Sequence, residues 1–278
     1  MARKTSLDLQ SMKADRSKIV MVTAYDYTMA RIVDSADVDM VLVGDSVGMV
    51  VQGLPDTLGV TLDDMIYHSR CVARGLNQAH LTVDMPFMSY QISPEQALAS
   101  AGRLVKEGHA QSVKLEGGER SAASIQAIVE AGIPVVAHIG LTPQSVNALG
   151  GFKVQGRSDA AAEQLLRDAH AVQEAGAFCV VLEMVPAELA SAVSDALQIP
   201  TIGIGAGVDC DGQVLVCNDL LGFDTSFKPR FVKRFAELEE PMIQAVKSYT
   251  KEVREGTFPT AAHAFHRRQG PRKVTKIY

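Results

Sequence analysis

VLVGD at residues 41–45 is the first of five stretches that decide the fold of this chain. The others read LTVD (81–84), VKLE (113–116), VVAH (135–138) and VVLE (180–183). Each is a short apolar run that precedes a helical pattern, which is typical of a buried parallel strand. Each run ends on one ionisable side chain: Asp45, Asp84, Glu116, His138 or Glu183. Because parallel strands of a barrel end at one mouth, where active sites lie, these side chains indicate a metal-assisted enzyme.

Strand and helix signals alternate on both sides of these runs, almost from one end of the chain to the other. The expected strands lie at residues 19–26, 41–45, 80–87, 112–118, 134–140, 178–186, 200–207 and 213–219. The expected helices lie at 28–36, 62–76, from 94 onward, 121–131, 158–175 and 231–256, with Thr61 and Ser93 as N-terminal caps. Eight such units in one direction favour a closed (β/α)8 TIM barrel over a doubly wound sheet.

Length and composition fit one such barrel. The 278 residues are close to the roughly 250 residues that the fold takes. Hydrophobic residues make up 47% of the chain, which is enough for one large core. We therefore expect a single domain over residues 1–278, with an extra C-terminal helical segment and an extended or mobile tail at about 257–278.

Charge and cysteine usage exclude several classes of partner. There are 27 Lys and Arg and 32 Asp and Glu residues, giving a net charge of -5 without a long basic stripe, so a nucleic-acid partner is not expected. No run approaches the ~20 apolar residues of a membrane span. The segment 1–17 lacks the apolar stretch of a secretory signal. The four cysteines show no metal-type spacing and call for no disulfides, which fits the cytoplasm.

Three of the strand-end acids, Asp45, Asp84 and Glu116, follow consecutive strands. Neighbouring strands lie about 4.8 Å apart, so the three carboxylates can converge on one small dication. Magnesium prefers such oxygen ligands and keeps waters that a substrate can replace. The alternative is that these acids only cap the helices that follow.

Lys114 and Glu116 are separated by one residue, so both side chains point to the same face of their strand, which we expect to be the barrel interior. A buried lysine needs a partner or a function. Lys114 is expected to hold the carboxylate of an anionic substrate, to form a Schiff base as an amine nucleophile, or only to pair with Glu116. The sequence around it does not choose among these.

Glu183 lies on the sixth strand, across the mouth from the expected metal ligands. A carboxylate placed there is well sited to take a proton from the carbon beside the carbonyl of a keto acid. A metal ion polarises the keto oxygen in such a site and stabilises the enolate. His138, on the strand between, is either a hydrogen-bond partner of the substrate or a structural group.

Two glycine-rich loops have both a functional and a structural interpretation. GIGAG (203–207) follows the seventh strand, where barrels often bind phosphate, although tight turning explains it equally well. GGFKVQGR (150–157) has hinge glycines and two cations, and is either a lid over the substrate or an ordinary loop.

Several longer stretches resemble the ketopantoate (3-methyl-2-oxobutanoate) hydroxymethyltransferase family. They read MVTAYDYTMA, LVGDSVGMVVQG, VDMPFMSY, SVKLEGGE, HIGLTPQSVNALGGFKVQGR, LEMVPAELA and IPTIGIGAG, in family order over most of residues 19–222. The chain departs from the family pattern at Gly59 and Asn218, where proline and histidine are expected. The charged tail after Phe265 also runs past the usual family end.

The resemblance implies a barrel of the phosphoenolpyruvate/pyruvate superfamily. It also implies transfer of a hydroxymethyl group from 5,10-methylenetetrahydrofolate to 3-methyl-2-oxobutanoate, giving 2-dehydropantoate through a Mg2+-stabilised enolate. By the same resemblance, Asp45, Asp84 and Glu116 match the metal ligands, and Glu183 matches the proton acceptor. The keto-acid contacts implied are Asp45, Ser46, Asp84 and Lys114. The family is homo-oligomeric, commonly decameric.

Three other functions compete with this one. The first is a Schiff-base aldolase that uses Lys114. The second is another metal-dependent lyase for a different 2-oxo acid. The third is a binding protein that has kept the pocket without catalysis. Covalent trapping with borohydride, loss of activity in EDTA, and binding without turnover distinguish these possibilities.

Overall fold

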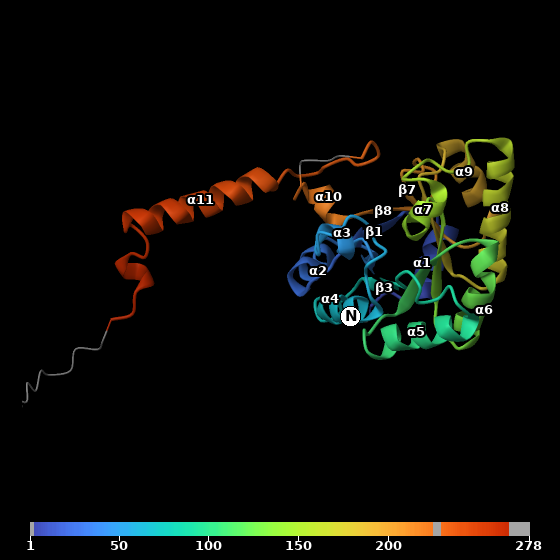
Figure 1. Cartoon of the computed structure of the whole chain (residues 1–278), viewed down its shortest axis with the longest axis horizontal. Coiled ribbons are helices and arrows are strands. Elements are labelled where there is room, and N and C mark those ends of the chain that lie inside the picture. Colours follow the sequence, from blue (N-terminus) through green and yellow to red (C-terminus); the bar gives the residue numbers. More distant parts are fainter. Residues whose placement is uncertain (1–2, 225–228, 267–278) are drawn as a thin grey trace, which may run out of the picture.

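The chain forms a closed barrel of eight parallel strands, each paired with the next and the eighth with the first. The computed structural model describes residues 3–224 and 229–266 (Figure 1). The strands are β1 (Ile19–Thr23), β2 (Met40–Val43), β3 (His80–Asp84), β4 (Ser112–Glu116), β5 (Val135–Gly140), β6 (Cys179–Glu183), β7 (Thr201–Ile204) and β8 (Gly212–Leu215). The pairing of Ile19 with Gly212 belongs to the β1–β8 ladder that closes the barrel, so the predicted TIM barrel is confirmed.

Eleven α-helices accompany the strands in the described part of the chain, and most of them cover the outside of the barrel (Figure 1). They are α1 (Ser6–Ala14), α2 (Tyr27–Asp34), α3 (Val47–Val50), α4 (Leu62–Ala73), α5 (Pro94–Lys106), α6 (Ala122–Glu130), α7 (Val146–Leu149), α8 (Asp159–Glu174), α9 (Ala187–Ala196), α10 (Cys217–Leu221) and α11 (Glu239–Glu255). Two caps match the sequence prediction. Thr61 and Asp64 form a reciprocal capping box on α4, and Ser93 caps α5 ahead of Pro94.

Most predicted strands end earlier than expected, and three elements show the physical reason. The first strand ends at Thr23 rather than at residue 26, because the Asp26 side chain accepts a hydrogen bond from the Met29 backbone and caps α2. The eighth strand ends at Leu215, and the residues after it form α10. The C-terminal helix begins at Glu239 rather than at residue 231, since the backbone of the preceding segment bonds to α10 instead.

The helix α1 was not expected and lies at the amino end of the barrel. Thr5 and Asp8 form a capping box at its start, and Leu9 is its one buried side chain. Leu9 joins the inner core cluster of the barrel, and Lys13 forms an ion pair with Asp211 at 2.7 Å. Because only one residue of α1 is buried, its sequence lacks the apolar stripe that predicts an amphipathic helix.

The core lies in two shells, which fix the position of the strand ends. The larger shell packs the outward side chains of the strands against the helices. The smaller shell fills the barrel interior and includes Met21, Met40, Val181 and Ile202. With the interior packed by apolar side chains, the polar residues that end the strands gather above it at the carboxyl mouth.

The helix α11 lies apart from the barrel in Figure 1, and all of its residues are at least partly exposed. Of the predicted tail, residues 257–266 contain one short 3-10 turn at Ala261–His263, and residues 267–278 lie outside the described part of the chain. Among the described residues, no helix combines the length and apolar character needed to cross a bilayer.

Candidate active site

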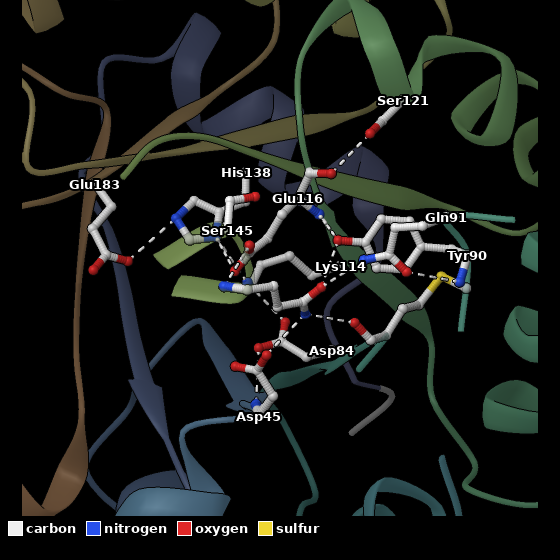
Figure 2. A network of polar contacts seen from close by, with 12 residues as sticks. Asp45, Asp84, Tyr90, Gln91, Lys114, Glu116, Ser121, His138, Ser145 and Glu183 are labelled. Atoms are coloured by element: carbon white, nitrogen blue, oxygen red, sulfur yellow. Dashed lines mark hydrogen bonds and ion pairs between the residues drawn. The ribbon is translucent and has the colours of Figure 1, made fainter. Parts of the chain in front are cut away.

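The side chains predicted from the strand ends come together at the carboxyl mouth of the barrel (Figure 2). Asp45 follows β2, while Asp84 and Glu116 end β3 and β4. These three acids are almost completely buried, as are Lys114 and His138. Glu183 ends β6 and is more accessible, with 17% of its side chain exposed. The predicted convergence of four acids and a histidine is therefore confirmed.

Lys114 pairs with Asp84 and not, as the sequence led us to consider, with Glu116. Lys114 Nζ lies 2.9 Å from Asp84 Oδ1, because the two residues are register partners on β3 and β4. The other Asp84 oxygen accepts a hydrogen bond from the Asp45 backbone at 3.0 Å. The side chains of register partners on adjacent strands are thus closer to each other than side chains two residues apart on one strand.

The charge state of this pair disfavours Schiff-base chemistry. Burial lowers the pKa of Lys114, but attraction to Asp84, Glu116 and Asp45 outweighs it and places the pKa above its ordinary value. Burial raises the pKa of Asp84, an effect that Lys114 opposes. Lys114 is therefore an ammonium group, which binds an anion well but is a poor nucleophile.

His138 lies between Glu116 and Glu183 (Figure 2). Its Nδ1 is 3.5 Å from Glu116 Oε1, and its Nε2 is 3.2 Å from Glu183 Oε2. Burial and the neighbouring Lys114 lower the pKa of His138, whereas hydrogen bonds to Glu116 and Glu183 raise it, and the balance lies at about 9. His138 Nδ1 also lies 3.2 Å from Lys114 Nζ, so the imidazole stands between Lys114 and Glu183 at the edge of the site.

Asp45 is an acid of the site without a cationic partner among the described residues. Its Oδ2 accepts a hydrogen bond from the Gln144 amide at 2.8 Å. Burial, together with repulsion from Asp84 and Glu116, raises the pKa of Asp45 to about 8. A cation beside Asp45 would reverse this shift, since positive charge favours the ionised carboxylate.

Ser46 lies beside Asp45, at the start of α3, and its hydroxyl is 2.8 Å from the hydroxyl of buried Tyr25. Gly44 precedes both residues. A Cβ atom at Gly44 would lie 2.8 Å from Ser46 Oγ and 3.5 Å from Asp84 Oδ2. The chain therefore needs glycine here to bring the serine hydroxyl close to the acids.

The magnesium assignment stays a prediction. Within residues 3–224 and 229–266, no three histidine, cysteine, aspartate or glutamate side chains are arranged as a ready metal-binding group. The chemistry of the site nevertheless fits a dication: Asp45, Asp84 and Glu116 are hard oxygen donors of the kind that Mg2+ prefers. Asp45 in particular forms no ion pair with a cation of the described residues, since Lys114 pairs with Asp84 instead.

Two residues of the network were not assigned a role from sequence. Tyr90, in the loop after β3, donates from its hydroxyl to Gln144 Oε1 at 2.7 Å and accepts a hydrogen bond from the Glu116 backbone at 3.1 Å. Gln144 lies in the short 3-10 turn Pro143–Ser145 after β5 and donates its backbone N–H to Glu116 Oε2 at 3.0 Å. Both residues lie in stretches that resemble the family, VDMPFMSY and HIGLTPQSVNALGGFKVQGR. This resemblance was the only feature of the sequence that could have marked them as part of the site.

The glycine-rich loops keep their two interpretations. Gly207 has φ +84°, and a Cβ atom there would lie 2.6 Å from Ala187 Cβ, so close packing against α9 explains this glycine. The backbone of Gln155 donates to Met184 O at 2.9 Å, which ties the 150–157 loop to the residue after Glu183. Phosphate binding and lid closure both stay predictions.

The family model for ketopantoate hydroxymethyltransferase matches residues 3–261 of the chain. The chain belongs to this family. It is 61% identical to the 3-methyl-2-oxobutanoate hydroxymethyltransferase of Syntrophotalea carbinolica, over 95% of this chain and 98% of that protein. It is 55% identical to the enzyme of the same name from Syntrophus aciditrophicus, over 94% of this chain and 96% of that protein.

Solved structures confirm the fold predicted for a ketopantoate hydroxymethyltransferase. The crystal structure of 2,3-dimethylmalate lyase, a PEP mutase/isocitrate lyase superfamily member, superimposes with a TM-score of 0.59 at 17% identity. The match covers 96% of this chain and 91% of that one. The predicted barrel fold is therefore confirmed.

Proposed function

We propose that the chain transfers a hydroxymethyl group from 5,10-methylenetetrahydrofolate to 3-methyl-2-oxobutanoate, giving 2-dehydropantoate for pantothenate biosynthesis, with Glu183 as the base. The observation that carries this proposal is the 61% identity to a curated 3-methyl-2-oxobutanoate hydroxymethyltransferase over 95% of the chain. The site supports the same conclusion, since it places an ammonium group and an accessible carboxylate around one mouth. The reaction needs both, to bind a keto acid and to remove its proton.

Lys114 supplies the charge that binds the substrate carboxylate. It is buried and ionised next to Asp84, and a buried ammonium interacts strongly with an incoming anion because little water screens it. The Ser46 hydroxyl is held by Tyr25 and can donate to a substrate oxygen. His138 reaches the same space from β5. These groups hold the keto acid with its C3 atom toward Glu183.

Glu183 takes the proton from C3 of the substrate. It is the most accessible of the four acids, and its Oε2 lies 3.2 Å from His138 Nε2. Its backbone is fixed from both sides, because Leu141 N donates to Glu183 O at 2.8 Å and Met184 N donates to Ile204 O at 2.9 Å. Glu183 keeps the proton while water releases the methylene carbon from the folate as formaldehyde, which breaks its two C–N bonds and leaves tetrahydrofolate. The carbon that lost the proton then attacks the formaldehyde carbon, and the alkoxide formed takes up a proton to become the hydroxyl of the hydroxymethyl group.

Asp45, Asp84 and Glu116 would hold a Mg2+ ion. When bound, the ion would supply positive charge that polarises the keto group and stabilises the oxyanion formed as C3 loses its proton. Negative charge is in excess in this site, which favours binding of a cation. In the described ion pairs of the site, the four acids have only Lys114 and His138 as basic partners.

A direct assay tests the proposed function. Purified protein is incubated with 3-methyl-2-oxobutanoate and 5,10-methylenetetrahydrofolate, with and without Mg2+, and 2-dehydropantoate is measured. Product should form and should depend on Mg2+. Product formation from a different 2-oxo acid alone would support the alternative of another metal-dependent lyase and overturn the proposal.

We also propose that the protein is a cytoplasmic homo-oligomer, a decamer by family resemblance. The exposed apolar side chains of α11 support self-association: Met242, Ile243, Val246, Tyr249 and Val253. All four cysteines are free thiols, in keeping with a reducing compartment.

A further inference from the structure

Gln144 lies between two of the acids proposed to hold the metal ion, and only 6% of the residue is exposed. Its Nε2 donates to Asp45 Oδ2 at 2.8 Å and to Met85 O at 2.9 Å. Its backbone N–H donates to Glu116 Oε2 at 3.0 Å. One residue of the turn after β5 thus contacts the acid that follows β2 and the acid that ends β4.

The direction of the Gln144 amide is fixed by its neighbours. Its Oε1 accepts hydrogen bonds from the Tyr90 hydroxyl at 2.7 Å and from Gln91 Nε2 at 3.0 Å. With the amide reversed, its oxygen would face the Asp45 carboxylate and the Met85 carbonyl, and its NH2 group would face the NH2 group of Gln91. Only the observed orientation satisfies both ends of the amide.

These contacts engage one oxygen of each acid and leave the other for a different partner. Asp45 Oδ2 is bonded to Gln144, so Oδ1 is the oxygen available for a ligand. Glu116 Oε2 is bonded to the Gln144 backbone, while Oε1 faces His138. Because the donors are neutral, they fix the two acids without supplying the positive charge that an ion would otherwise provide.

We propose that Gln144 is a positioning residue that, with Tyr90 as its support, fixes which oxygens of Asp45 and Glu116 face the metal ion and the substrate. This inference rests on the proposed function. Partners that orient metal ligands from behind typically change metal affinity 10–100-fold when they are removed. Gln144 acts through the acids and has no contact of its own with the reacting atoms.

The test compares Gln144→Leu with Gln111→Leu. Gln111 lies near the amino end of the barrel, where its side chain accepts from Leu81 N and donates to Lys4 O, both at 3.1 Å. Each variant therefore loses a partly or fully buried amide with bonds to the backbone, but only Gln144→Leu affects the acids. The measurements are Mg2+ binding by titration calorimetry without substrates, kcat and KM at saturating Mg2+, and the melting temperature.

We expect Gln144→Leu to bind Mg2+ about 10–100-fold more weakly than the parent and to lose kcat even at saturating Mg2+. Gln111→Leu should melt at a lower temperature but keep the parent affinity and kcat. If both variants are folded and show equal Mg2+ affinity and kcat, Gln144 is only structural and the inference is wrong. An inactive parent would instead contradict the proposed function.

Tyr90→Phe gives a second test that does not depend on Gln144→Leu folding. It keeps the ring and removes the hydroxyl that donates to Gln144 Oε1. Mg2+ binding should weaken about threefold to tenfold, the effect of one lost hydrogen bond. Parent-like Mg2+ affinity in folded Tyr90→Phe would overturn the role of this network, whatever the outcome for Gln144→Leu.

Discussion

Gly140 and Glu183 face each other across the β5–β6 pairing, and no side chain fits between them. Gly140 has φ +91°, and a Cβ atom there would lie 2.4 Å from Glu183 O. The proposed base is therefore placed by the main chain of its neighbouring strand as well as by His138. A larger residue at Gly140 should therefore displace the backbone of Glu183 and lower the rate of the reaction.

Gly140→Ala should lower both stability and kcat. The matched control is Gly132→Ala, because Gly132 also has a positive φ, +84°, but has no atom within 4 Å of an added Cβ. The left-handed conformation alone costs about 1–2 kcal/mol in either variant. Urea unfolding and steady-state kinetics should show a greater loss of stability, and a loss of kcat, for Gly140→Ala only. Equal kcat in the two variants would contradict this account of Glu183.

Glu183→Gln should stop proton abstraction from the substrate. The parent should exchange the C3 proton of 3-methyl-2-oxobutanoate for deuterium in D2O without folate, and the variant should do so about 10²–10⁴-fold more slowly. Proton NMR of the substrate measures this step apart from hydroxymethyl transfer. Undiminished exchange in the variant would remove Glu183 as the base.

Removal of the metal distinguishes the proposed mechanism from a Schiff-base aldolase. EDTA should abolish product formation, and added Mg2+ should restore it. Sodium borohydride with the keto acid should leave Lys114 unmodified, because its amine is protonated beside Asp84. A mass increase on Lys114, together with activity that persists in EDTA, would support the aldolase instead.

His80 should make stability depend on pH. It is buried at the start of β3, with its ring nitrogens bonded to Lys4 O at 3.0 Å and Ser112 Oγ at 2.9 Å, and burial lowers its pKa to about 4. The unfolded chain, with an ordinary His pKa of about 6.5, therefore binds more protons between these values. The stabilisation that neutral, buried His80 gives the folded state is complete above about pH 6.5. As the pH decreases to 4, the free energy of unfolding falls by up to about 3 kcal/mol.

Denaturant unfolding of His80→Gln at several pH values measures this effect. The variant should lose less stability than the parent between pH 7 and pH 4. His170→Gln, which removes an exposed histidine of α8, should follow the parent. Parallel curves for the parent and His80→Gln would show that His80 does not carry this pH dependence.

Val246→Glu should weaken self-association through α11. Val246 is 64% exposed on the apolar side of the helix, and burying a carboxylate in an apolar contact is strongly unfavourable. Light scattering should show smaller particles than for the parent and at least about tenfold weaker assembly. The exposed neighbour Lys247 gives the control, because Lys247→Glu changes charge without touching the apolar side chains.

Most of the barrel and the central acids of the site were predictable from local sequence. Short runs of β-branched residues predict where the strands lie, and the alternation of side chains along each strand predicts which of them face inward. The position of Asp84, Glu116 and Glu183 at strand ends follows from these two rules together with the shared mouth of parallel strands. Ser93 and Thr61 were likewise predictable, because capping depends on residues within one turn.

The contacts made across the fold were not predictable in the same way. The sequence left three interpretations of Lys114 open, and pairing with Glu116 on its own strand was the only ion pair among them, whereas register with β3 brings Lys114 to Asp84. Gln144 and Tyr90 lie in turns, whose conformations carry no periodic signal. The two departures from the family pattern, Gly59 and Asn218, lie outside the acid network.

The helix α1 has a consequence for how the chain is made. The partners of this helix and of the residue pair before it lie far along the sequence: the Lys13 side chain donates to Asp211 Oδ2 and Ser194 O, and the Lys4 carbonyl accepts a hydrogen bond from Gln111 Nε2. Because α1 precedes every strand in the chain, it leaves the ribosome before them and cannot complete these contacts until nearly every strand has been synthesised. Closure of the amino end of the barrel is then a late event in folding, and docking of α1 completes it.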